Sequence, residues 1–87
     1  MKIWVITKKN NKIVLDKIFE NEKTTLASIY DLISVACDDF DIGKPLYLSK
    51  NESEIADFRR TVFYPADFIE KINFHTLEVE IIDEKDK

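Results

Sequence analysis

Apolar and polar residues alternate along residues 1–20 in a pattern that is typical of two β-strands joined by a turn. Residues 1–7 and 13–19 are rich in β-branched and aromatic side chains, and the polar residues 8–12 between them have nothing to bury. Asparagine tolerates a positive φ better than most residues, so Asn10 and Asn11 predict the turn. We expect the rest of the chain to pack around this hairpin.

The length of the loop decides which residues share a face of the hairpin. A two-residue loop would place Val5 opposite Asp16, a charge against an apolar side chain. A three-residue loop pairs Val5 with Leu15, and we therefore predict the longer loop. One face then carries Met1, Ile3, Val5, Ile13, Leu15 and Phe19. The other carries Lys2, Trp4, Ile6, Val14, Asp16 and Ile18.

The spacing becomes helical after a polar break at residues 21–23. Thr24 or Thr25 can cap a long helix here. Gly43, the only glycine, is expected to end that helix in the left-handed conformation, and Pro45 prevents its continuation. Apolar residues three and four apart form the stripe of this helix: Leu26, Ile29, Ile33, Ala36 (or Cys37) and Phe40.

A short strand and a second helix are predicted next. Leu46–Leu48 has the apolar character of a short strand, and Ser49 and Glu52 have the spacing of a capping box, which marks a helix start. In the aromatic segment 63–69, Pro65 ends one helical turn and can begin another. The apolar stripe of this second helix is Ile55, Phe58 and Val62.

The end of the chain predicts a half-buried strand followed by a charged tail. Leu77, Val79 and Ile81 alternate with two glutamates. Residues 83–87 all carry charged side chains and are expected to fray. The predicted order is therefore ββαβαβ, in a single α+β domain over residues 1–82.

This order resembles the β-grasp fold of ubiquitin and its relatives. Four features carry the resemblance: the hairpin, the long helix, the strand at residues 46–48 and the closing strand at residues 77–81. The resemblance implies a mixed sheet of four or five strands wrapped on one long helix. It also implies that the first and last strands lie side by side and parallel in the centre of the sheet.

The same resemblance implies functions that this chain does not match. Ubiquitin and the β-grasp sulfur carriers act through a C-terminal Gly-Gly, whereas residues 84–87 read Glu-Lys-Asp-Lys. The β-grasp ferredoxins need four cysteines for their cluster, and the chain has one. The one use of the β-grasp fold that remains compatible with this sequence is the binding of another protein without catalysis. The chain also resembles small bacterial proteins with a Phe-Tyr-Pro-x-Asp-Phe-Ile segment and an acidic tail, which implies no activity.

Composition predicts a small cytoplasmic domain without cofactors. The chain has 87 residues, 45% of them hydrophobic, and no apolar run that approaches a membrane span. Cys37 and His75 are the only residues of their types, so neither a disulfide nor a zinc site is expected, and we expect Cys37 to be buried. The net charge is −4, and an acidic chain is disfavoured as a nucleic-acid binder.

The sequence contains few residues that are candidates for catalysis or for binding a metal or ligand. Residues 38–43 faintly resemble a calcium loop, but Phe40 and Ile42 occupy positions where oxygen ligands are needed. His75 has no evident partner for acid–base catalysis, and we expect it in the loop before the last strand. Arg59 and Arg60 can hold a phosphate or carboxylate, or balance nearby acids of the second helix.

The second face of the hairpin carries too many large apolar groups to be left in water. Either residues 55–69 fold over Trp4, Ile6, Val14 and Ile18, or this face stays open and binds a protein partner or a second copy of the chain. We favour a non-catalytic protein-interaction module whose candidate contacts are Trp4, Ile6 and Tyr47, with Arg59 and Arg60 at the rim. The alternative is ligand or nucleic-acid binding through Arg59, Arg60 and the hairpin lysines Lys8, Lys9 and Lys12.

Overall fold

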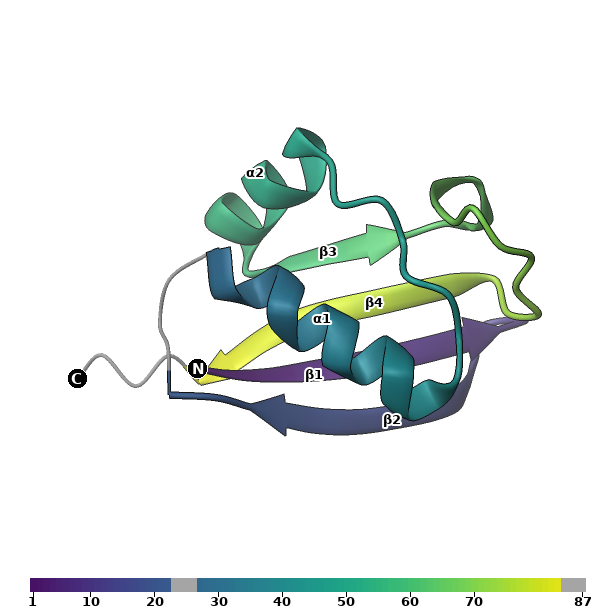
Figure 1. Ribbon diagram of the computed structural model, residues 1–87, viewed down its shortest axis with the longest axis horizontal. Coiled ribbons are helices and arrows are strands. Elements are labelled where there is room, and N and C mark those ends of the chain that lie inside the picture. Colours follow the sequence, from purple (N-terminus) through teal and green to yellow (C-terminus); the bar gives the residue numbers. More distant parts are fainter. Residues whose placement is uncertain (23–26, 84–87) are drawn as a thin grey trace.

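The computed structural model describes residues 1–22 and 27–83 and shows an α+β fold with a four-stranded antiparallel sheet and two helices (Figure 1). The strands are β1 (Lys2–Lys9), β2 (Lys12–Glu20), β3 (Arg60–Phe63) and β4 (Thr76–Asp83). The helices are α1 (Ala27–Phe40) and α2 (Ser49–Phe58), and a 3-10 turn, η1 (Pro65–Asp67), follows β3. The predicted caps Thr24 and Thr25 and residues 84–87 of the predicted tail lie outside the described residues, whereas β4 extends to Asp83.

The hairpin forms with its turn at Asn10 and Asn11, but the loop has two residues rather than the predicted three. Both asparagines have positive φ values, 55° and 64°, and Lys9 pairs with Lys12 directly beside them. The register shifts between Thr7, which pairs with Leu15, and Lys8, which pairs with Ile13. This bulge in β2 supplies the extra residue that we assigned to the loop.

The bulge changes which side chains of β2 share a face. Phe19 pairs with the buried Ile3, as predicted for the core face. Val5 pairs with Lys17 rather than with Leu15, and Ile13 pairs with Lys8 on the opposite face from the core. Apolar residues at the start of β2 therefore lie outside the core.

The first and last strands lie side by side in the centre of the sheet, which has the order β2-β1-β4-β3. They run antiparallel, with Val5 opposite Val79 and Thr7 opposite Leu77. The parallel pairing implied by the β-grasp resemblance is therefore wrong for this chain, and the sheet is not mixed within the described residues. Since β4 enters the sheet from β3 by a loop at the hairpin-tip end, it can only run back along β1 in the opposite direction (Figure 1).

The first helix ends two residues earlier than Gly43 suggested. Asp41, not Gly43, has the left-handed conformation, with a φ of 59°. The amide of Ile42 donates to the carbonyl of Cys37 at 3.0 Å, and the amide of Asp41 donates to that of Asp38 at 3.2 Å. These two bonds form a Schellman motif, which aspartate can complete because it tolerates the left-handed region.

The predicted strand at Leu46–Leu48 does not form. The amide of Leu46 donates to the carbonyl of Asp67 at 2.8 Å, and Pro45 makes an isolated bridge with Phe68. These bonds tie the segment to the turn η1, away from the sheet, and leave Leu46 and Leu48 exposed. The next helix does begin near Ser49, as predicted, but Leu48 is its N-cap residue.

The third strand was not predicted. Arg59 ends α2 with a left-handed φ of 63°, and the chain then enters β3, which pairs with β4. Phe58 and Val62 are four residues apart, which imitates a helical stripe, although only Phe58 belongs to α2. A non-glycine residue in the left-handed region leaves no mark in the sequence, so the end of the helix was missed.

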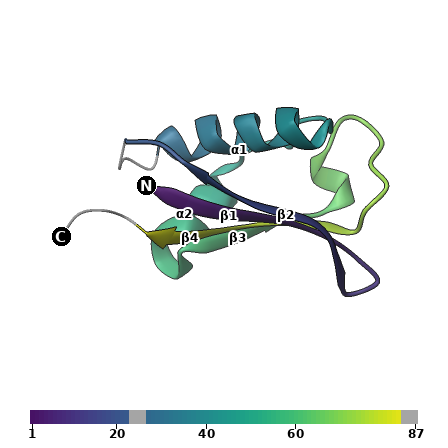
Figure 2. The ribbon, with the colours of Figure 1, turned by 90° about the horizontal axis from the view of Figure 1, so that it is seen from below.

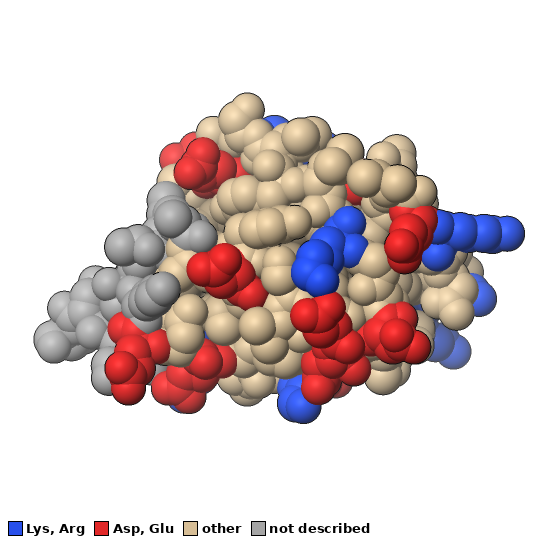
Figure 3. Space-filling view, viewed as in Figure 1, with Lys and Arg blue, Asp and Glu red and all other residues tan. Residues whose placement is uncertain are grey.

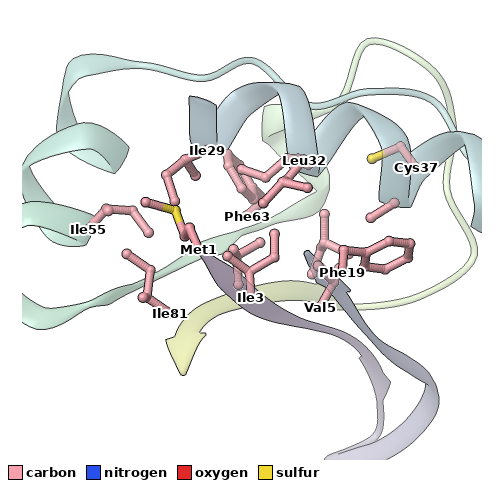
Figure 4. Packing of buried hydrophobic residues seen from close by; sticks show 14 of the residues in the cluster. Met1, Ile3, Val5, Phe19, Ile29, Leu32, Cys37, Ile55, Phe63 and Ile81 are labelled. Atoms are coloured by element: carbon pink, nitrogen blue, oxygen red, sulfur yellow. The ribbon is translucent and has the colours of Figure 1, made fainter. Parts of the chain in front are cut away.

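The core lies between α1 and one face of the sheet (Figures 2 and 4). Side chains from α1 meet those of the two central strands; Met1 and Ile55 lie at the end near α2, and Phe63 lies below Ile29 and Leu32. Phe19 and Phe40 meet edge to face, with ring centroids 6.0 Å apart. The buried apolar residues are Met1, Ile3, Val5, Phe19, Ile29, Leu32, Ile33, Ala36, Cys37, Ile55, Phe63, Phe68, Phe74, Leu77, Val79 and Ile81.

Candidate functional site

The face of the sheet opposite α1 is open: no described helix lies over β1 and β2 on that side (Figure 2). We call it the open face and define it by the strand pairing. It comprises Trp4, Ile6 and Lys8 of β1, Ile13, Asp16 and Ile18 of β2, Thr76, Glu78 and Glu80 of β4, and Arg60 and Val62 of β3. Ile13 and Ile18 are each about half exposed, at 51% and 53%.

Residues 55–69 do not cover the open face, so the first of our two alternatives is wrong. Ile55, Phe63 and Phe68 point into the main core on the α1 side instead. The other large apolar groups of the segment, Phe58 and Ile69, are exposed to solvent. The connection from α2 to β3 is too tight to bring the segment under the sheet.

Trp4 and Ile6 lie together on the open face, as predicted. The indole Nε1 of Trp4 donates to Asp16 Oδ2 at 2.9 Å, and the ring is half-buried beside its cross-strand partner Ile18. Ile6 is only 4% exposed although no described segment covers it. Its neighbours on the same face enclose it, because Trp4 and Lys8 flank it along β1.

Glu78 holds two cations at the centre of this face. Its carboxylate lies 3.1 Å from Lys8 Nζ and 3.1 Å from Arg60 Nη2, and its side chain is largely buried beneath them. Arg60 therefore pairs across the sheet with Glu78, not with the acids of the second helix that we considered. Two of the cations considered for anion binding, Lys8 and Arg60, are thus partly neutralised by one acid.

A groove of about 370 Å³ adjoins the open face at its β3 end. Lys50, Glu54 and Phe58 line one wall, and their spacing of four residues places them on one side of α2. The lining residues on the other wall are Arg60, Thr61, Val62 and Tyr64. Phe58 and Tyr64 are exposed by 69% and 52%, so two aromatic rings border this groove.

A buried polar chain fixes the two walls of the groove. Asn51 Nδ2 donates to Thr61 Oγ1 at 2.9 Å, and Thr61 Oγ1 donates to Glu54 Oε1 at 2.6 Å. Asn51 Oδ1 also accepts from the amide of Leu48 at 3.0 Å. Asn51 takes the part that we predicted for the capping box of Ser49 and Glu52, one residue away from the predicted position.

The remaining candidate residues lie elsewhere. Tyr47 is on the α1 side, where its ring meets those of Tyr30 and Phe63 at centroid distances of 5.6 and 6.5 Å. Its hydroxyl is buried without a hydrogen-bond partner among the described residues, and burial, followed by Glu52, raises its pKa. Arg59 lies at the end of α2, where its carbonyl accepts from the amide of Ile81 at 2.8 Å.

Cys37 is buried and His75 lies in the loop before the last strand, as the sequence predicted. Cys37 is fully buried in the core, and burial raises the pKa of its thiol from 9.0 to about 11. His75 precedes β4, and its Nδ1 accepts from the amide of Asn10 at 3.1 Å. This bond joins the last loop to the hairpin turn.

Charge and hydropathy place no further site on the described part of the chain. Acidic side chains are spread over the face that carries α1, with basic ones among them (Figure 3). Within residues 1–22 and 27–83, no three His, Cys, Asp or Glu side chains gather as a metal site would require. None of the described helices is long and apolar enough to cross a membrane.

The sequence predicted part of the open face. It grouped Trp4 and Ile6 with Arg60 at the rim, and these three residues lie on the same face, with Glu80 of β4 between Trp4 and Arg60. It missed the groove, because β3 itself was not predicted. The one available signal was the pair of aromatics Phe58 and Tyr64, between which residues 60–63 have strand character. Comparison of the chain with known protein families, with curated protein sequences and with solved structures gives no match.

Proposed function

We propose that this chain is a small protein-interaction module without catalysis of its own, and that it binds a protein partner through the open face. The observation that carries the proposal is the half-exposed Ile18 beside Trp4, with the half-exposed Ile13 further along β2, on a sheet face that no described segment covers. Apolar patches of this kind, with a tryptophan among them, are typical of protein-binding surfaces.

The environment of Trp4 suits a binding contact. Its indole N–H already donates to Asp16, so a partner can cover the ring without leaving a donor unsatisfied. Lys8, Arg60 and Glu78 lie beside these apolar groups and supply charges of both signs. Apolar contacts bordered by charged and polar groups are common at protein–protein interfaces.

The alternative, nucleic-acid or anion binding, has less support. Glu78 engages both Lys8 and Arg60, and Asp16 and Glu80 lie on the same face. A phosphate backbone approaching this face would meet three carboxylates. The hairpin residues Lys9 and Lys12 are exposed, but they stand alone at the tip.

Two broader proposals accompany this function. The buried, unpaired Cys37 fits a reducing compartment such as the cytoplasm. For the fold, a hairpin followed by a helix across one face of the sheet supports the β-grasp resemblance, whereas the antiparallel pairing of β1 with β4 departs from it.

Affinity capture with matched variants tests the function. Wild-type protein, Ile18→Glu and Val35→Glu are immobilised and exposed to lysate of the cells that produce the protein. Ile18 and Val35 are equally exposed, at 53% and 52%, but Val35 lies on α1, away from the open face. We expect a partner that binds wild type and Val35→Glu and is lost from Ile18→Glu, because a buried charge opposes binding.

Three controls make the result decisive. Circular dichroism confirms that each variant is folded, and light scattering shows whether the retained partner is a second copy of the chain. Trp4→Ala is expected to lose the same partner as Ile18→Glu. Equal retention by Ile18→Glu and Val35→Glu, or a loss of stability in Trp4→Ala with partners unchanged, would make the open face an ordinary surface.

A further inference from the structure

The outer edge of β3 offers unpaired backbone groups to the groove. The amide of Ile81 donates to the carbonyl of Arg59, so this carbonyl and the backbone groups of residues 61 and 63 point toward β4. In an antiparallel pair the intervening residues direct theirs the other way. Arg60 and Val62 therefore present N–H and C=O groups to the outer edge, and both residues line the groove. Among the described residues no strand pairs with this edge.

We propose that the groove between α2 and β3 binds an extended, acidic peptide segment of a partner protein, which adds to β3 as a further strand. Strand addition uses the backbone groups of Arg60 and Val62, whereas the groove walls select side chains. The groove shares Arg60 and Val62 with the open face but does not include Trp4, Ile13 or Ile18, so peptide binding here does not require a partner on those three residues.

The charges of the groove indicate an acidic segment. Lys50 and Arg60 line it, each with a half-exposed side chain. Their existing ion pairs leave donors for a ligand: Lys50 is 3.8 Å from Asp67, the limit of an ion pair, and Arg60 uses Nη2 for Glu78. The single carboxylate of the lining, Glu54, already accepts from Thr61.

The two aromatic side chains that line the groove favour a peptide that also carries an apolar side chain. Phe58 and Tyr64 are among the most exposed rings of the described chain, and an apolar side chain of the peptide would remove both from water. A nucleotide also combines a ring with negative charge. The peptide is favoured because an extended backbone can pair with the outward N–H and C=O groups of both Arg60 and Val62, whereas a nucleotide has no such backbone.

Fluorescence anisotropy with labelled peptides tests the proposal. The probe is Asp-Val-Phe-Val-Asp, with Lys-Val-Phe-Val-Lys as the charge-reversed peptide and AMP as the competing nucleotide. We expect saturable binding of the acidic peptide and at least about tenfold weaker binding of the basic one. Phe58→Ala and Lys50→Glu should each weaken the acidic peptide by about tenfold or more. Lys9→Glu, the same charge reversal at an exposed hairpin residue, should leave binding nearly unchanged.

Amide chemical shifts then locate the ligand. We expect changes in residues 50–64 and β4, with little effect on β2. The proposal is overturned by absence of saturable binding at roughly 1 mM peptide, by equal binding of the two peptides, by preference for AMP, or by a footprint on Trp4 and β2. Phe58 is exposed, so its truncation does not threaten the fold, and loss of binding in that variant reports on the groove itself.

Discussion

Cys37 shows at the scale of one residue how burial alone removes reactivity. The thiol is fully buried among apolar side chains of the core, which disfavours the thiolate and raises its pKa from 9.0 to about 11. A thiolate is the reactive form, so this residue is expected to be inert in the folded protein near neutral pH.

The same pKa difference predicts how stability depends on pH. Below pH 9 the folded and unfolded states both keep the thiol proton. Between pH 9 and about 11 only the unfolded state loses it, so the free energy of unfolding should fall across this range, by roughly 2 to 3 kcal/mol in total. Urea unfolding at several pH values measures this loss. Cys37→Ala should show a smaller loss over the same range, and parallel curves for the two proteins would contradict the prediction.

Asn51 is the polar residue on which the position of α2 depends. It is completely buried and bonds to both Leu48 and Thr61. Asn51→Ala would leave those partners unsatisfied and should lower the free energy of unfolding by about 1 to 3 kcal/mol. Ser49→Ala, at an exposed residue two positions away, should change it by less than about 0.5 kcal/mol. Urea denaturation of both variants distinguishes this cap from the one predicted at Ser49, which would give the reverse order.

At the scale of elements, the hairpin turn is set by two residues in the left-handed region. Asn10 and Asn11 both have positive φ values in a two-residue loop. Glycine accepts this conformation without a steric penalty, so Asn11→Gly should raise the free energy of unfolding by about 0.5 kcal/mol. The double substitution to alanine should lower it by about 1 to 2 kcal/mol. Thermal unfolding checks both signs, and a destabilised Asn11→Gly would argue for a different turn.

The bulge in β2 links the turn to the surface of the molecule. It inserts one residue between the pairs Thr7–Leu15 and Lys8–Ile13, so the face of the strand changes there. Phe19 then faces α1 while Ile13 and Ile18 face outward. Lys17 closes the edge of the core, where its ammonium lies 3.3 Å from Asp39 of α1. A local irregularity thus decides which apolar groups can meet a partner.

At the scale of the whole molecule, the chain builds one core and leaves a second apolar surface. A domain of 87 residues has only enough helix to cover one side of its sheet, and α1 and the end of α2 both contribute to the same side. The open face keeps its apolar groups partly sheltered by charged neighbours, Lys8, Glu78 and Arg60. Capture with Ile18→Glu and Val35→Glu tests the use of this face, because the two replaced side chains are apolar and equally exposed but only Ile18 lies on the open face.

The sequence by itself determined the elements whose signals are local. The turn at Asn10 and Asn11, the amphipathic α1, the helix start near Ser49 and the alternating β4 follow from residue type and spacing alone, because each depends on neighbours in the chain. The burial of Cys37 followed from its place on the apolar stripe.

Tertiary structure decided the rest. The bulge in β2, the antiparallel run of β4 beside β1 and the existence of β3 depend on partners far away in the sequence. The left-handed Arg59 accepts a bond from Ile81 of β4, whereas the left-handed Asp41 is held by bonds within the last turn of α1. Whether residues 55–69 cover the open face is likewise settled by the tight connection from α2 to β3. The open face and the groove are therefore products of packing, because each combines residues whose spacing in the chain carries no common pattern.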